Sequence, residues 1–132
     1  MTGIAGPDTL RTVPSSPDRT LTEVALIGMR FHTCVGILPQ ERDAAQPLEL
    51  DLVVRHDRGA SHILDYRELY ESTRSLIASE PLTYLELIAE SLAERALTVD
   101  GVTWCRVTVR KPHVALGGPL MHAAVSIERT RE

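Results

Sequence analysis

The chain has 132 residues, of which 43% are hydrophobic, 24% charged and 4% aromatic. This length suits one domain with a sizeable core and is too short for two. The net charge of −4 argues against a nucleic-acid partner, because phosphate binding needs clustered positive charge, and the few aromatic residues offer no platform for stacked bases.

The apolar residues form no run near the roughly 18 residues of a membrane-spanning helix, and the start lacks the apolar core of a signal peptide. Cys34 and Cys105 both lie in strand-like apolar runs, which is typical of buried, reduced thiols in a cytoplasmic protein. The cysteines and histidines show none of the spacings of a metal site. We therefore expect a cytoplasmic protein with no membrane partner and no bound metal.

Residues 1–20 combine glycine, proline and serine without any hydrophobic period, so we expect a disordered tail before a domain over residues 21–132. Alternating residues from Thr22 to Val35 predict a first strand, and those over residues 48–55 predict a second. One face of the first strand is expected to hold Val24, Leu26, Gly28 and Arg30. Between the strands lies a turn-rich loop of residues 36–42, which contains Glu41.

Two helices are predicted after a short polar link. Asp65 is placed to cap the first, in which apolar residues at helical spacing run from Tyr66 to Ile77. Thr83 is the expected N-cap of the second, and Glu86 stands three residues later, at the spacing of a capping box. An unbroken apolar stripe follows in this second helix, formed by Leu85, Ile88, Ala89, Leu92, Ala93 and Ala96.

Alternation over residues 102–111 predicts a third strand, which should end before Pro112 because proline cannot donate to a ladder. A glycine-rich loop leads to a last strand from Ala123 to Arg129. The order β-β-α-α-β-β indicates an α+β fold, in which one four-stranded antiparallel sheet carries both helices on one face.

Thirteen of the 14 basic residues are arginine, and Lys111, at the end of the third predicted strand, is the only lysine. Arginine keeps its proton at working pH, whereas a desolvated lysine can exchange protons near neutrality. Lys111 is therefore a candidate for proton transfer, and a solvated surface cation is the alternative interpretation.

Several short stretches, taken in this order, resemble the dihydroneopterin aldolase family. They are residues 36–42 (Gly-Ile-Leu-Pro-Gln-Glu-Arg) with Gln46, then Asp65-Tyr66, then residues 85–89 (Leu-Glu-Leu-Ile-Ala), Lys111-Pro112-His113 and a closing strand over residues 125–129. The resemblance covers about residues 22–130. It implies the tunnelling fold, in which the sheets of several subunits close into a barrel. A tetrameric ring, or an octamer of two stacked rings, would cover the edges that a lone sheet leaves unpaired.

The same resemblance implies an aldehyde-lyase of folate biosynthesis. Its reaction is the retro-aldol cleavage of 7,8-dihydroneopterin into 6-hydroxymethyl-7,8-dihydropterin and glycolaldehyde, with no metal or organic cofactor. The imine of the pterin accepts the electrons of the broken bond, so a lysine is needed only to give and take protons.

By this resemblance Lys111 transfers the protons, and Tyr66 contacts the substrate side chain and helps to move its hydroxyl proton. Glu86 would accept two hydrogen bonds from the pterin ring, a charge-assisted contact. Leu85 would add a backbone contact, and Glu41 would orient the substrate. In the family the tyrosine comes from a neighbouring subunit, so the site would exist only in a homo-oligomer.

Three alternatives stay open. The same chemistry serves a 2′-epimerase of dihydroneopterin or its triphosphate, for which Arg42, Arg67 and Arg110 are candidate phosphate ligands. A non-catalytic ring could keep the pterin pocket, since the link of residues 55–64 is shorter than is usual in the family and Ile63 stands where a threonine is common. A zinc-dependent pterin synthase of this fold would need a histidine triad. No such triad is suggested by His32, His56, His62, His113 and His122.

Overall fold

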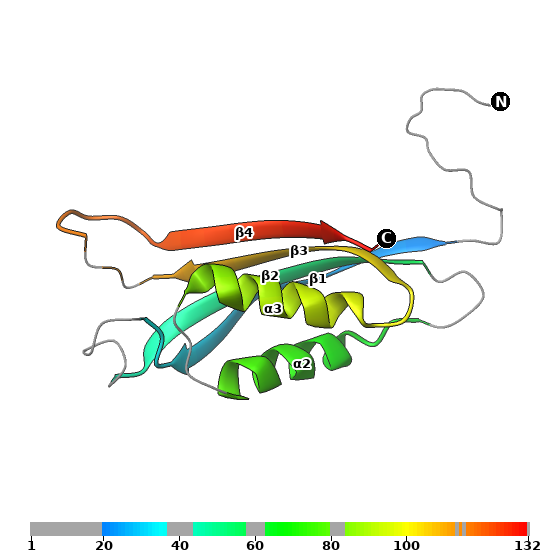
Figure 1. The fold of residues 1–132 in the computed structure, drawn as a ribbon, viewed down its shortest axis with the longest axis horizontal. Coiled ribbons are helices and arrows are strands. Elements are labelled where there is room, and N and C mark those ends of the chain that lie inside the picture. The colour runs from blue at the N-terminus through cyan, green and yellow to red at the C-terminus, as the bar shows by residue number, and fades with distance from the viewer. Residues whose placement is uncertain are drawn as a thin grey trace, which may run out of the picture.

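One four-stranded antiparallel sheet, in the order β1-β2-β3-β4, carries two helices on one face (Figure 1). The elements are β1 (Leu21–Thr33), β2 (Gln46–Asp57), α2 (Tyr66–Ser79), α3 (Leu85–Leu97), β3 (Val102–Lys111) and β4 (Ala123–Thr130). This computed structural model describes residues 20–36, 44–57, 63–79, 84–112, 114 and 116–131. The predicted α+β order is confirmed, whereas the predicted tail up to residue 19 and the loop that carries Glu41 lie outside the described residues.

The core lies between the sheet and the helices. Alternate residues of the two central strands face the helices and are buried: Leu48, Leu50, Leu52, Val54, Cys105, Val107 and Val109. The predicted stripe of α3 packs against them, and Ile88, Ala89, Leu92, Ala93 and Ala96 are all buried. Helix α3 covers β3 and β4, whereas α2 covers β1. Neither of these two helices has the length and apolar character needed to cross a membrane.

The starts of the two helices differ in their capping. Asp65 caps α2 as predicted, since its Oδ1 accepts a hydrogen bond of 2.9 Å from the backbone N–H of Arg67. The predicted cap of α3 is wrong: the N-cap is Tyr84, not Thr83, and it makes no side-chain cap. The Tyr84 carbonyl already accepts the first helical hydrogen bonds, from Leu87 and Ile88. Glu86 therefore stands one residue too early for a capping box.

A bulge changes the phase of β1, which corrects the predicted alternation. The register shifts between Leu26 and Met29, so that Ile27 and Gly28 together oppose Asp51. Gly28 adopts a φ of 72°, a conformation that glycine reaches without steric cost. As a result Met29 is buried on the helix-covered face with Leu26, and Arg30 lies exposed on the other face.

Both cysteines are free thiols. Cys105 is buried in β3, and burial raises the pKa of its thiol. Cys34 was expected to be buried as well but is only half-buried, because β1 ends just before it, at an edge of the sheet.

A tight turn joins α3 to β3 and closes over His56. The Gly101 carbonyl accepts a hydrogen bond of 2.9 Å from the Asp57 amide, and His56 Nε2 lies 3.1 Å from the Asp100 carbonyl oxygen. His56 is buried. Gly101 has a φ of 88°, and a Cβ there would lie 2.7 Å from His56 Nε2. The turn therefore needs glycine for two reasons.

We predict that Gly101→Ala lowers the free energy of unfolding by about 2–4 kcal/mol, through a left-handed backbone and a steric clash together. Gly117 is the matched control, because its φ is 89° but a Cβ there would meet nothing within 4 Å. Gly117→Ala should therefore cost only the backbone part, about 1–2 kcal/mol. Urea unfolding of both variants measures the difference, and equal losses would contradict this account of the turn.

Candidate active site

Lys111 is the last residue of β3 and pairs with Ala123 of β4. Its position in the alternation puts it on the helix-covered face, in line with Val107 and Val109. Only 9% of Lys111 is exposed. Lysine is almost never so deeply buried without a specific reason, so the interpretation as a solvated surface cation is wrong.

The first turn of α3 lies at the same end of the molecule as the end of β3 (Figure 1), and Lys111 is the last residue of that strand. Because a short turn over residues 98–101 joins α3 to β3, the helix runs antiparallel to the strand and begins where the strand ends. The first turn of α3 carries Leu85, which is half-buried, and Glu86, which is exposed. The structure thus brings the entrance of α3 and the end of β3 together at one end of the sheet.

Tyr66 starts α2 at the other end of the helix layer. The two helices run antiparallel, and the 14 residues of α2 span roughly 20 Å, so Tyr66 lies about one helix length from the start of α3. The strand register agrees, since Leu26 beneath α2 is level with Val107 through Leu52. Val107 lies four residues before Lys111 on β3, which is roughly 13 Å along the strand, and β1 lies two strands away from β3. Within one chain, therefore, Tyr66 does not reach Lys111.

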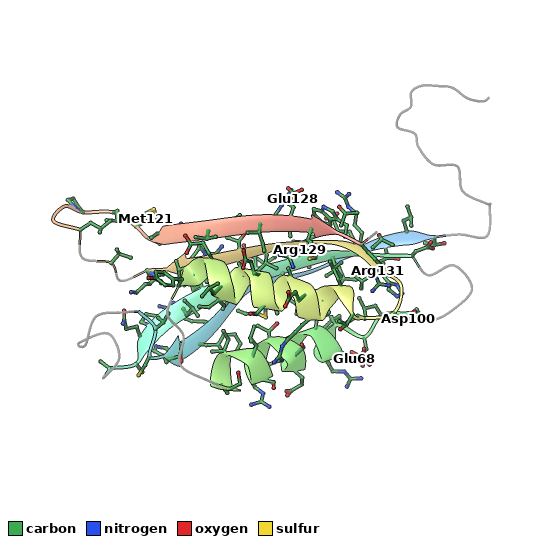
Figure 2. The ribbon with its side chains drawn as sticks, viewed as in Figure 1. Glu68, Asp100, Met121, Glu128, Arg129 and Arg131 are labelled. Atoms are coloured by element: carbon green, nitrogen blue, oxygen red, sulfur yellow. The ribbon has the colours of Figure 1, made fainter. Side chains whose placement is uncertain are left out.

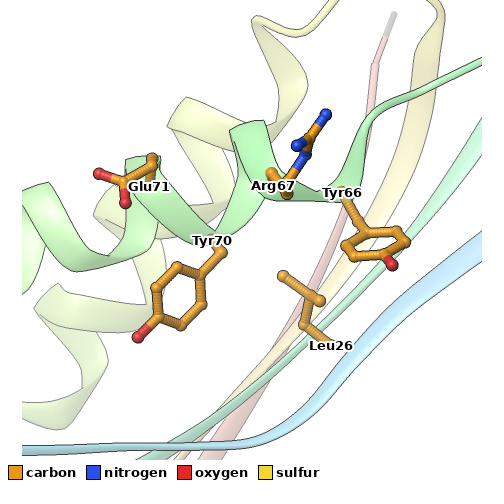
Figure 3. Close-up of a pocket in the computed structure, with 5 residues that line it drawn as sticks. All are labelled: Leu26, Tyr66, Arg67, Tyr70 and Glu71. Carbon is orange, nitrogen blue, oxygen red and sulfur yellow. The ribbon is translucent and has the colours of Figure 1, made fainter.

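A cleft of about 440 Å³ opens beside Tyr66, between α2 and β1. Tyr66 and Tyr70 extend from α2 toward β1 on either side of Leu26 (Figure 3). Arg67 and Glu71 complete the lining. Tyr70 follows Tyr66 by one helical turn and also stacks on Phe31 of β1, with ring centroids 6.0 Å apart. Its helical spacing placed it in the predicted apolar stripe, but 40% of Tyr70 is exposed, because the cleft leaves one side of its ring uncovered.

Two of the three candidate phosphate ligands are described, and both already bind carboxylates. Arg67 makes three side-chain hydrogen bonds to Asp65, of 2.9–3.2 Å, and the pKa of Asp65 is lowered by them. Arg110 lies on the opposite face of the sheet from its neighbour Lys111. Arg42, Glu41 and His113 lie outside the described residues, as does Thr83.

Arg110 ties together the strands at the end of the sheet that carries Lys111. Its two terminal nitrogens each lie 2.8 Å from an oxygen of Asp51, and its Nε donates to Glu49 at 3.3 Å. Asp51 Oδ1 also accepts the amide of Gly28 at 2.8 Å, and Arg30 reaches Glu49 at 3.3 Å. This network links β3 to β2 and to the bulge of β1, so it fixes the backbone position of Lys111.

The same contacts govern protonation within the network. The hydrogen bonds from Arg110 are the main reason why the pKa of Asp51 is lowered. The Gly28 amide and the positive charge of Arg110 lower it further, and burial opposes them.

Among the described residues, no group of three or more His, Cys, Asp or Glu side chains is arranged to hold a metal ion.

Comparison with known proteins adds to this geometry. Residues 24–128 match the family model described as FolB, dihydroneopterin aldolase. The chain belongs to this family. It is 27% identical to the dihydroneopterin aldolase of Streptomyces coelicolor over 118 residues, which cover 84% of this chain and 99% of that protein.

Solved structures of aldolases have the same fold. A putative dihydroneopterin aldolase from Vibrio cholerae matches with a TM-score of 0.74 and 27% identity, over 85% of this chain and 99% of that one. The Escherichia coli dihydroneopterin aldolase, solved in complex with neopterin, matches with a TM-score of 0.72 and 23% identity, over 82% of this chain and 98% of that one. The four-stranded sheet with two helices is thus the family fold.

The Asp51–Arg110 pair yields a prediction for stability. A carboxyl whose folded pKa is lowered stabilises the protein fully above its unfolded pKa of about 4, and this stabilisation is lost as the pH falls through the folded value. Asp51→Asn should therefore lower the free energy of unfolding by about 1–3 kcal/mol at pH 7 and flatten its decline in acid.

Glu23→Gln is the control, since Glu23 pairs with Arg55 at 3.4 Å but is well exposed, and such pairs contribute at most about 1 kcal/mol. Denaturant unfolding measures the free energy of unfolding of both variants between about pH 2 and pH 7, a range that includes the carboxyl pKa values. A wild-type acid profile in Asp51→Asn would refute the role given to this pair.

Proposed function

We propose that this chain is a dihydroneopterin aldolase, which cleaves 7,8-dihydroneopterin into 6-hydroxymethyl-7,8-dihydropterin and glycolaldehyde. One observation carries the proposal: in a member of this family, the solitary lysine is buried at a strand end, where the first turn of α3 presents a carboxylate. The E. coli relative crystallised with neopterin supports a pterin as the ligand.

The reaction uses the pterin itself as the electron acceptor. A proton leaves the C2′ hydroxyl, the C1′–C2′ bond breaks, and glycolaldehyde departs with the new carbonyl. The bond electrons pass to C1′ and into the N5=C6 imine, where N5 takes a proton. C1′ is then protonated and N5 gives up its proton, which leaves the hydroxymethyl product. Each step moves a proton, so a positioned amine is the group that the reaction most needs.

Lys111 is the proposed donor and acceptor of these protons near N5 and C1′. Glu86 is the proposed ligand of the pterin ring edge, accepting hydrogen bonds from the 2-amino group and N3. The amides of Leu85 and Glu86 precede the first helical hydrogen bonds of α3, so a backbone donor from Leu85 suits the same ring edge. Glu41 is the proposed orienting carboxylate of the loop before β2.

Tyr66 is proposed to act in the site of a neighbouring copy, on the side chain of the substrate. The separation of Tyr66 from Lys111 within one chain supports this arrangement, because a site that needs both must draw on two copies. We therefore propose a homo-oligomeric ring, of four subunits or of two stacked rings, in which each interface forms one site and the sheets close into a barrel.

The proposed substrate has no phosphate. Arg110 lies on the face away from Lys111, and Arg67, in the cleft lining beside Tyr66, already binds Asp65, so a phosphate would have to compete with that carboxylate for Arg67. Re-formation of the broken bond with the opposite configuration would give 2′-epimerisation by the same residues. Side-by-side assays of dihydroneopterin and its triphosphate, with product stereochemistry, measure both activities.

Lys111→Ala should lower kcat by about 10²- to 10⁴-fold, which is the usual contribution of one proton-transfer group. Lys111→Arg is the sharper variant, because it keeps the positive charge but cannot give up its proton, and it should be equally impaired. Glycolaldehyde and pterin product are measured together by chromatography. Wild-type turnover by Lys111→Arg, or no turnover by the wild type itself, would overturn the proposal.

Glu86→Gln should weaken pterin binding by about 10- to 100-fold, since it removes the charge from a paired hydrogen-bonding contact. Glu90 lies one turn further along α3 and is also exposed, so Glu90→Gln is the matched control and should bind normally. Titration calorimetry with neopterin measures both. Equal binding by the two variants would remove Glu86 from the site.

A further inference from the structure

Asp65 and Arg67 form an ion pair around the start of α2, with Tyr66 between them in the chain. The Asp65 carboxylate accepts the backbone N–H of Arg67 at 2.9 Å and three hydrogen bonds from its guanidinium, at 2.9–3.2 Å. Side chains two residues apart on a helix do not face each other, so the pair forms only because Asp65 lies just before the helix. One carboxylate thus binds both the backbone N–H and the guanidinium of Arg67.

These donors are also the ones that a phosphate group takes. Arginine binds phosphate through paired hydrogen bonds, and backbone N–H groups at a helix start add to them. Arg67 lines the cleft beside Tyr66, and 83% of its side chain is exposed, so it is open to a substrate. The pKa of Asp65 is lowered, first by the side-chain hydrogen bonds of Arg67 and then by its backbone N–H. Asp65 therefore keeps its charge at neutral pH and fills the place of a phosphate.

The ion pair also sets the direction of the arginine. Figure 3 shows the Arg67 guanidinium turned away from Leu26, the floor of the cleft, whereas the rings of Tyr66 and Tyr70 extend toward it. The bidentate contact with Asp65 holds the guanidinium in this position. Without that contact, the exposed arginine would sample its other rotamers.

The remaining charges at this end of α2 do not favour a phosphate. Glu68 is exposed in the first turn of the helix (Figure 2), and Glu71 of the cleft lining binds Arg74 at 2.9 Å. Together with Asp65 and Arg67, the group holds more carboxylates than guanidiniums, so it repels an approaching anion. Removal of the Asp65 charge would make the group neutral and release Arg67.

We propose that Asp65 is a specificity-determining residue, which makes the enzyme prefer dihydroneopterin over its triphosphate. Its carboxylate takes the donors that a phosphate would bind, and its charge repels that phosphate. A phosphorylated substrate must break an existing ion pair before it gains a contact with Arg67, which is discrimination by a repulsive element. The inference rests on the proposed function, in which Tyr66 contacts the substrate side chain, the part that would carry the phosphates.

Asp65→Asn tests the inference, because asparagine caps a helix as well as aspartate does but leaves the Arg67 charge unpaired. The value of kcat/KM for the triphosphate, divided by that for dihydroneopterin, should rise by about tenfold. It is measured as formation of 6-hydroxymethyl-7,8-dihydropterin from each substrate. Glu71→Gln is the matched control, since it removes a carboxylate of the cleft that binds Arg74 and not Arg67. This control should leave the ratio within about twofold of the wild-type value.

A double variant shows whether Arg67 receives the phosphate. Adding Arg67→Gln to Asp65→Asn should abolish most of the rise. A ratio that Asp65→Asn leaves unchanged, or a rise that persists in the double variant, would overturn the inference. Circular dichroism checks that α2 stays folded in each variant.

Binding separates this inference from the proposed function. Titration calorimetry with neopterin and neopterin triphosphate measures the same preference in each variant without any turnover. If the affinities follow the expected pattern but the wild type cleaves no dihydroneopterin, only the proposed function is overturned. If the wild type cleaves dihydroneopterin but Asp65→Asn changes neither ratio, only the role of Asp65 is overturned.

Discussion

The antiparallel pairing of β2 with β3 controls where the candidate catalytic groups lie. It carries Lys111 to one end of the sheet and releases the chain after β2 at the other end, where Tyr66 begins α2. Helix α3 cannot slide to reduce this separation, because it is joined to β3 by the tight turn at Gly101 and its apolar stripe packs against the sheet. A rigid fold of this kind keeps the two groups apart in a single copy, and a reaction that needs both must take place between copies.

The two faces of the sheet have different side chains and different roles. The helix-covered face holds the apolar core and, at its rim, the buried amine of Lys111. The open face is covered by cross-strand contacts between charged and polar side chains: Arg106 with Glu128, Thr108 with Ser126, and Arg110 with Asp51 and Glu49. Since Arg110 and Lys111 are consecutive, the ion pairs of one face fix the backbone that presents the amine on the other. Stability and site geometry are therefore coupled at this strand end.

Much of this arrangement could be predicted from the sequence. The alternation of β2 and β3 and the apolar spacing of α3 follow directly from periodicity, and the single lysine at a strand end pointed to the candidate site. The phase of β1 after Leu26 could not be predicted, because a bulge depends on a tertiary contact between the Gly28 amide and Asp51. The cleft beside Tyr70 was missed for a similar reason. Helical spacing shows which side of α2 carries Tyr70, but it does not show that a cleft is left between α2 and β1 on that side.

The proposed distribution of each site over two copies can be measured directly. Lys111→Ala and Tyr66→Ala chains would be unfolded together, refolded as mixed oligomers, and assayed for glycolaldehyde release beside each variant alone. Each variant alone should be nearly inactive, whereas the mixture should recover about a quarter of wild-type activity, since one interface in four unites an intact lysine with an intact tyrosine. If oligomers that contain both chains show no recovery, Lys111 and Tyr66 do not meet across an interface, and the account is wrong.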